Sequence, residues 1–190
     1  MISNQPFWME LQQESATTRK LLERLPERAL SWKPHEKSMP MGHLAVHLAA
    51  LTRWFYFIVH QDDYDVTSTD LRMQDPDDVA GILELFDQSL TIAVEALKKQ
   101  PDERLLDLWC LRNGEQLIVE MPRGLFIHTL LKHLIHHRGQ LSVYLRLQNV
   151  PFQDTTRTCR IDRRNSLCEE RRSQTTGRES GNIHRKTQET

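Results

Sequence analysis

Residues 128–148 read HTLLKHLIHHRGQLSVYLRLQ, a leucine-rich segment that contains four histidines. Its apolar residues recur every three or four positions, which is typical of a helix with one buried face. Together with Phe126, just before this stretch, they are Leu130, Leu134, Leu141 and Tyr144. A helix turns by about 100° per residue, so His137 falls in the middle of this face and His133 lies near it, one turn earlier. Both side chains are therefore predicted to point into the interior, whereas His136 lies at the edge and His128 faces away.

A second helix is expected to begin after Ser38, a good N-cap residue, and to run without a break to about His60. Its apolar face is marked by Leu44, Leu51, Trp54, Phe55 and Ile58. His47 lies within this face, and His43 lies one turn before it, toward the edge. A packed interior can therefore receive His47 from one helix and the pair His133 and His137 from another.

Two more helices complete the expected fold. Helical spacing of apolar residues predicts one helix over residues 4–25. Another helix, capped by Asp75, is expected to end before Pro101. The histidine-rich helix itself covers about residues 123–148. The Asn113-Gly114 pair between two apolar runs indicates a short hairpin before that last helix. Four helices of about 20 residues with short connections predict an all-α fold, a four-helix bundle.

The end of the chain differs in composition from the rest. From Asp154 onward there are no aromatic residues and very few aliphatic ones, so a disordered tail is expected over residues 153–190, after a bundle domain over residues 1–152. The abrupt change to Arg, Ser and Thr suggests an out-of-frame extension as a hypothesis. The expected domain is mildly acidic, which argues against nucleic-acid binding.

Composition also excludes other classes of protein. Three cysteines without CxxC spacing predict neither a disulfide framework nor a cysteine zinc site. No apolar run reaches membrane-spanning length and the N-terminus has no leader pattern, so a cytoplasmic protein without a membrane segment is expected.

Three inward-facing histidines from two helices favour a metal site. A single buried histidine is more often hydrogen-bonded in the core, and that alternative stays open for each of them. An i, i+4 pair places two imidazoles on one side of an ion, and a third completes a set that leaves positions open, as in catalytic sites. His43 and His136 are reserve ligands if the site is shifted by one turn.

The string HLIHHRGQLSVYLR, residues 133–146, resembles the HxxxHRGQ signature of the DinB-like (DinB/YfiT) superfamily of metal-dependent enzymes. SMPMGHLAVHLAALTRWF, residues 38–55, is similar to the second helix of that family. The resemblance implies an up-down-down-up bundle, a homodimer, and Zn²⁺ or Ni²⁺ bound by His47, His133 and His137. It also implies relatives that act as thiol-cofactor-dependent transferases and isomerases.

The resulting expectation is a thiol-cofactor-dependent transferase that acts on a small molecule. A metal-dependent hydrolase and a non-catalytic metal-binding or structural dimer are the alternatives, and no acid or base residue is assigned. Gln140 is expected to orient a neighbouring imidazole. Arg138 is expected to form an ion pair, either with a carboxylate between helices or, the favoured alternative, as a surface or interface salt bridge. Gly139 is expected to permit a close helix approach, and Tyr144 to pack in the core.

Overall fold

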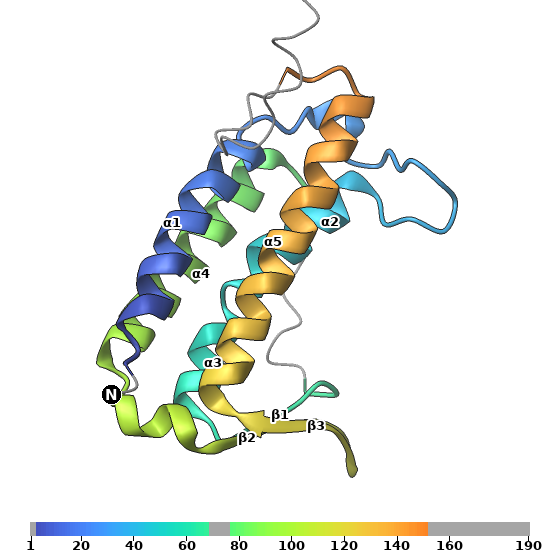
Figure 1. Cartoon of the computed structure of the whole chain (residues 1–190). Helices are drawn as coiled ribbons and strands as arrows, with labels where there is room; N and C mark the ends of the chain where they lie inside the picture. The colour runs from blue at the N-terminus through green and yellow to red at the C-terminus, as the bar shows by residue number, and fades with distance from the viewer. Residues whose placement is uncertain (1–2, 69–76, 152–190) are drawn as a thin grey trace, which may run out of the picture. The chain divides into compact units, whose positions relative to one another are not determined.

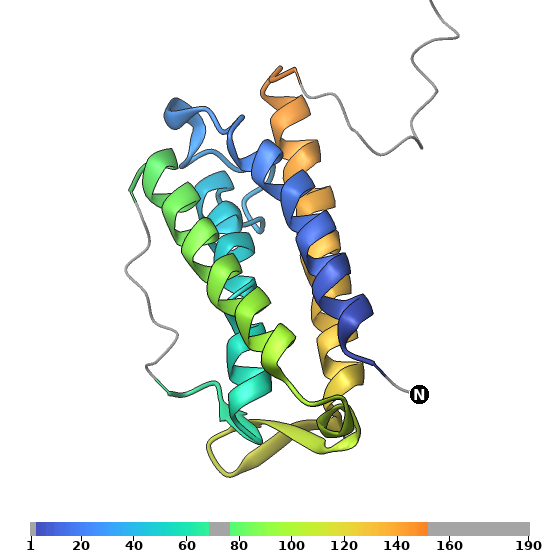
Figure 2. The same cartoon turned by 90° about the vertical axis from the view of Figure 1, so that its left-hand side faces the viewer.

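The computed structural model describes residues 3–68 and 77–151, and long helical segments that lie side by side dominate it (Figures 1 and 2). The helices are α1 (Gln5–Leu22), α2 (Met41–Leu51), α3 (Trp54–His60), α4 (Val79–Lys99) and α5 (Arg123–Leu147), with 3₁₀ turns at Glu27–Ala29 and Asp102–Leu106. The strands are β1 (Asp63–Asp65), β2 (Leu108–Asn113) and β3 (Gln116–Pro122). The predicted tail, residues 153–190, lies outside the described residues, so the division of the chain after residue 152 stays a prediction.

The direction of the helices determines which residues can meet. The colours of Figures 1 and 2 show that α1 and α5 run one way, whereas α2, α3 and α4 run the other way. This is the up-down-down-up order that the resemblance implies. Helix α1 packs on α4 and α5, and the line formed by α2 and α3 packs on the same two helices. Leucines dominate the core between them, and the apolar area they remove from water is the main stabilising term of the fold.

A small sheet at one end makes the fold mostly helical rather than all-α. Strand β2 lies between β1, to which it is parallel, and β3, to which it is antiparallel. The predicted hairpin is confirmed: Asn113 pairs with Gln116 across a two-residue turn, and Gly114 supplies the positive φ of 59° that this turn requires. Trp109 of β2 is fully buried, with its ring 4.3 Å from that of Phe126 on α5.

The predicted uninterrupted helix from Ser38 to His60 is wrong in two respects. It begins at Met41, after an N-cap at Pro40, and it breaks between Leu51 and Trp54. At the break the buried Thr52 hydroxyl donates a hydrogen bond to the Ala49 carbonyl at 2.8 Å, which competes with the regular backbone ladder.

The start of the third predicted helix is also corrected. Helix α4 begins at Val79, and its N-cap is Asp78, whose carboxylate accepts a hydrogen bond from the Gly81 amide at 2.8 Å. The expected cap, Asp75, lies outside the described residues. In residues 3–68 and 77–151, no helix combines the length and the apolar character needed to cross a membrane.

A buried arginine joins the start of α5 to the end of α3. Arg123 has no exposed side-chain surface, and its guanidinium donates to the carbonyls of Ile58 and Gln61 and, at 2.6 Å, to the Asp62 carboxylate. Those carbonyls lie at the C-terminal end of α3, where a cation is favourable. Burial lowers the pKa of Arg123, and the hydrogen bond that the guanidinium donates to Asp62 opposes that shift. Arg123 thus donates the hydrogen bonds that water would otherwise have to donate to the carbonyls at the end of α3.

Replacing Arg123 should destabilise the protein much more than removing its carboxylate partner. Arg123→Met leaves buried carbonyls without a donor, so the free energy of unfolding should fall by about 2–4 kcal/mol. Asp62 is 79% exposed, so Asp62→Asn should cost less than about 1 kcal/mol. Urea unfolding of both variants measures the difference, and equal losses would contradict the role assigned to the carbonyl contacts.

Candidate metal centre

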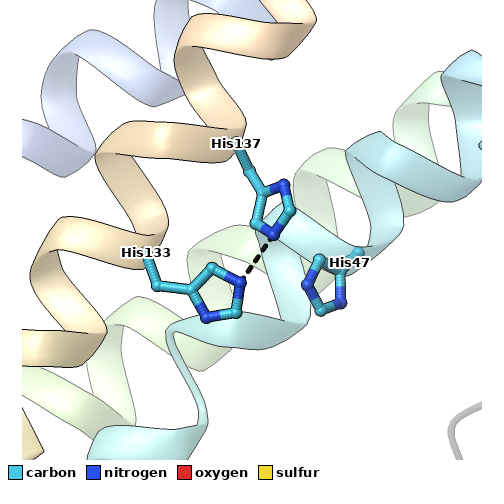
Figure 3. A group of neighbouring side chains, drawn as sticks. All are labelled: His47, His133 and His137. Carbon is cyan, nitrogen blue, oxygen red and sulfur yellow. Dashed lines mark hydrogen bonds between the residues drawn. The ribbon is translucent and has the colours of Figure 1, made fainter.

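Three histidines from two helices converge between α2 and α5 (Figure 3). His47 comes from α2, and His133 and His137 come from successive turns of α5. One ring nitrogen from each of the three lies within 4.8 Å of the other two. These are the residues that helical spacing selected, and they meet because α2 and α5 pack against each other with their apolar faces.

The two histidines of α5 are in direct contact. Nε2 of His137 lies 2.6 Å from Nε2 of His133, and their ring centroids are 4.5 Å apart. The His47 ring approaches that of His137 edge to face, with centroids 4.7 Å apart, and its centroid lies 5.7 Å from that of His133. All three rings therefore surround one small volume.

Gln140 determines which nitrogen of His137 carries the proton. Its amide oxygen lies 2.7 Å from Nδ1 of His137. An amide oxygen can only accept, so Nδ1 donates, and a neutral His137 has its lone pair on Nε2. The short contact between the two Nε2 atoms then requires His133 to donate from its own Nε2. A change of tautomer at His133 would turn both lone pairs toward a shared ion.

The surroundings favour the neutral forms of His47 and His133. His137 is only 9% exposed and His47 is half-buried, but His133, which was predicted to point into the interior, is exposed. The group therefore has one side toward solvent. Burial, together with the neighbouring histidines, lowers the pKa of His47 to about 4. The same causes, burial first and then His137 and His136, lower the pKa of His133. At neutral pH both imidazoles can therefore offer a lone pair.

The donor set fits a divalent ion of the zinc or nickel type. Imidazole nitrogens are ligands that such ions prefer. Two nitrogens at about 2.0–2.1 Å from Zn²⁺ in a tetrahedron are about 3.3 Å apart, which lies between the 2.6 Å contact and the 4.8 Å limit of the cluster. Small side-chain rotations therefore suffice to form three bonds. Three protein ligands leave a fourth position open for water or substrate.

The other predicted site residues surround this group without joining it. Arg138 lies beside the cluster but pairs with Glu14 of α1, at 2.5 Å to the carboxylate and 3.0 Å to the backbone carbonyl. The reserve ligands His43 and His136 are both exposed, although the His136 ring lies 5.1 Å from that of His137.

Two features of this region were missed or wrongly interpreted. Gly139 does not permit a close helix approach, because a Cβ there would meet no atom within 4 Å. Glu14 was not identified as the partner of Arg138, since nothing in its local sequence distinguishes it from the other glutamates of the chain. The ligand roles of the three histidines stay a prediction.

Comparison with known proteins places the chain in a family. The family model described as "DinB family" matches residues 1–158. The uncharacterized protein YrdA of Bacillus subtilis is 27% identical over 139 residues, covering 70% of this chain and 75% of YrdA.

Solved structures show the same fold. A DinB-like protein of Bacillus cereus superposes with a TM-score of 0.60 at 23% identity, covering 78% of this chain and 95% of that one. The DinB-like protein YjoA of B. subtilis gives a TM-score of 0.61 at 19% identity, covering 77% and 96% of the two chains.

The fold and the site define a class: mostly helical proteins that bring a histidine triad together between two helices. The match over residues 1–158 makes the assignment specific. This chain belongs to the DinB family.

The stability of the metal-free protein should fall as the pH is lowered below about 6.5. In the unfolded chain His47 has its ordinary pKa of 6.5, and in the fold its pKa is about 4. Between these values the unfolded chain binds more protons, so stability is lost as the pH falls through this window. Thermal unfolding of chelator-treated protein from pH 7.5 to 4 measures this slope, and His47→Gln should flatten it. Equal slopes for the two proteins would contradict the assignment.

Proposed function

We propose that this protein is a divalent-metal-dependent enzyme in which His47, His133 and His137 hold the ion. The observation that carries this proposal is the convergence of three imidazole nitrogens within 4.8 Å on the partly open side of a helical interior. A divalent ion held there would acidify a coordinated thiol or water and polarise an electrophile. The reaction proposed is transfer of a low-molecular-weight thiol to a small electrophilic substrate.

The composition of the triad favours thiol transfer over hydrolysis. The group contains no carboxylate, and the carboxylate of Glu14 on the neighbouring helix α1 is paired with Arg138. A coordinated thiol is deprotonated without an additional base. Glu84 and Glu95 are exposed on α4 and supply no base either.

The residues around the triad would hold it in position. Gln140 fixes the tautomer and the orientation of His137, as outer partners of ligating histidines commonly do. The pair formed by Arg138 and Glu14 is largely buried, with side chains 12% and 22% exposed, and it anchors α5 to α1 at the level of the triad. Three neutral ligands leave the charge of the ion uncompensated, which favours an anionic thiolate as the fourth ligand.

A thiol-binding titration tests this proposal. Zinc-loaded protein should bind N-acetylcysteine in a calorimetric titration, and the S-methyl derivative, which cannot form a thiolate, should bind at least about tenfold more weakly. Chelator-treated protein should show neither affinity. His133→Ala and His137→Ala should both fail to retain zinc at one equivalent per chain.

The reserve ligands provide matched controls. His43→Ala and His136→Ala remove exposed histidines from the same two helices, so both should retain zinc and the preference for the free thiol. Zinc retention without any thiol preference would favour the hydrolase alternative, and ester hydrolysis by the same sample would then be measured. Zinc binding that survives both triad variants would refute the ligand assignment.

A further inference from the structure

A pair of aromatic residues lies on α5 and its neighbouring loop, beyond the triad. Tyr144 follows His137 by seven residues, so the two lie on the same face of α5, about 10 Å apart along the helix axis. The Trp32 ring meets the Tyr144 ring edge to face, with centroids 5.8 Å apart. Trp32 precedes α2, and the loop that contains it passes beside the C-terminal, orange part of α5 in Figure 1.

The side-chain directions bring this pair toward His47, whereas His137 leans the same way along α5 as Tyr144 does. Side chains on a helix lean toward its N-terminus, so Tyr144 covers the turn that contains Gln140, the residue bonded to His137. Helix α2 runs antiparallel to α5, so His47 leans the opposite way, toward the start of α2 and the Trp32 loop. The two helices thus direct His47 and Tyr144 toward the same region.

The position of Trp32 is fixed by the helix that supplies His47. Its backbone carbonyl accepts a hydrogen bond from the Met41 amide at 2.8 Å, and the Leu30 carbonyl accepts one from Gly42 at 2.8 Å. A side chain at Gly42 would approach Leu30 to 3.1–3.2 Å, so the loop lies tightly against the first turn of α2. Trp32 is therefore a rigid feature of the site's surroundings.

Neither aromatic ring is fully buried in the core. Trp32 and Tyr144 both pack against the core cluster, as expected for Tyr144, but both are only half-buried, so part of each side chain stays exposed. Within residues 3–68 and 77–151, the Tyr144 hydroxyl and the Trp32 indole N–H make no hydrogen bond. Each ring thus offers an apolar face and an unused polar group, the combination that aromatic residues contribute to ligand sites.

We propose that Trp32 and Tyr144 form the wall of a substrate subsite beside the triad, which receives an aromatic or bulky apolar arm of the molecule whose head binds the metal. This inference rests on the proposed function, because the head needs the metal. It assigns specificity to the pair: the triad and its ion bind the reacting group, and the two rings select the substituent attached to it.

Two hydroxamates that share a metal-binding head test the subsite. Zinc-loaded protein is titrated calorimetrically with acetohydroxamate and with 3-phenylpropanohydroxamate, which carries an aryl arm. The aryl probe should bind about tenfold more tightly. Tyr144→Ala should reduce this advantage to about threefold or less and leave acetohydroxamate affinity unchanged, which also shows that the variant is folded and metal-loaded. Tyr144→Phe should keep the advantage if the ring supplies it.

Trp32→Ala should act in the same direction as Tyr144→Ala, and Tyr56→Ala is the matched control. Tyr56 is a partly exposed tyrosine on α3 that stacks on His60, outside the triad, and its removal should leave both affinities unchanged. Equal affinities for the two probes in the wild type would overturn the subsite while the metal site stands. An aryl advantage that persists in both Tyr144→Ala and Trp32→Ala would overturn it as well. Failure to retain zinc would overturn the subsite and the proposed function together.

Discussion

The packing of α2 against α5 is the constraint on which the site depends. Two histidines one turn apart on a single helix supply only one side of a coordination sphere, so a third donor has to come from a facing helix. The interior contact between α2 and α5 supplies it as His47. The contacts of two arginines hold this arrangement. Arg138 fixes α5 to α1 through Glu14, and Arg123 fixes the first residue of α5 to the end of α3.

A histidine cluster in an apolar interior conflicts with stability. Burial and mutual repulsion lower the pKa of His47 and of His133, so the metal-free fold is least stable at acidic pH, where these two imidazoles would be protonated. An ion that binds the folded chain and not the unfolded one relieves this cost and adds its own binding free energy. A site of this kind therefore combines a local conflict in the fold with the capacity to bind a ligand, as functional sites commonly do.

Much of the fold could be predicted because its determinants are periodic and local. The apolar spacing of α5 places His137 in the buried face of that helix, and the same reasoning places His47 on the apolar face of α2. The features that were not predicted depend on distant or ambiguous partners. Strand β1 is only three residues long and exists through pairing with β2, more than forty residues later. The break at Thr52 depends on a single side-chain hydrogen bond. Several nearby aspartates made the cap of α4 ambiguous, and the structure uses Asp78.

The central claim is that one ion is held by these three imidazoles, and X-ray absorption at the zinc edge of zinc-loaded protein tests it most directly. The account predicts three imidazole nitrogens at about 2.0–2.1 Å from the zinc and one further oxygen, nitrogen or sulfur ligand. One of the imidazoles should be lost in His47→Ala. A spectrum with fewer than three imidazoles in the wild type, or one unchanged by His47→Ala, would contradict it.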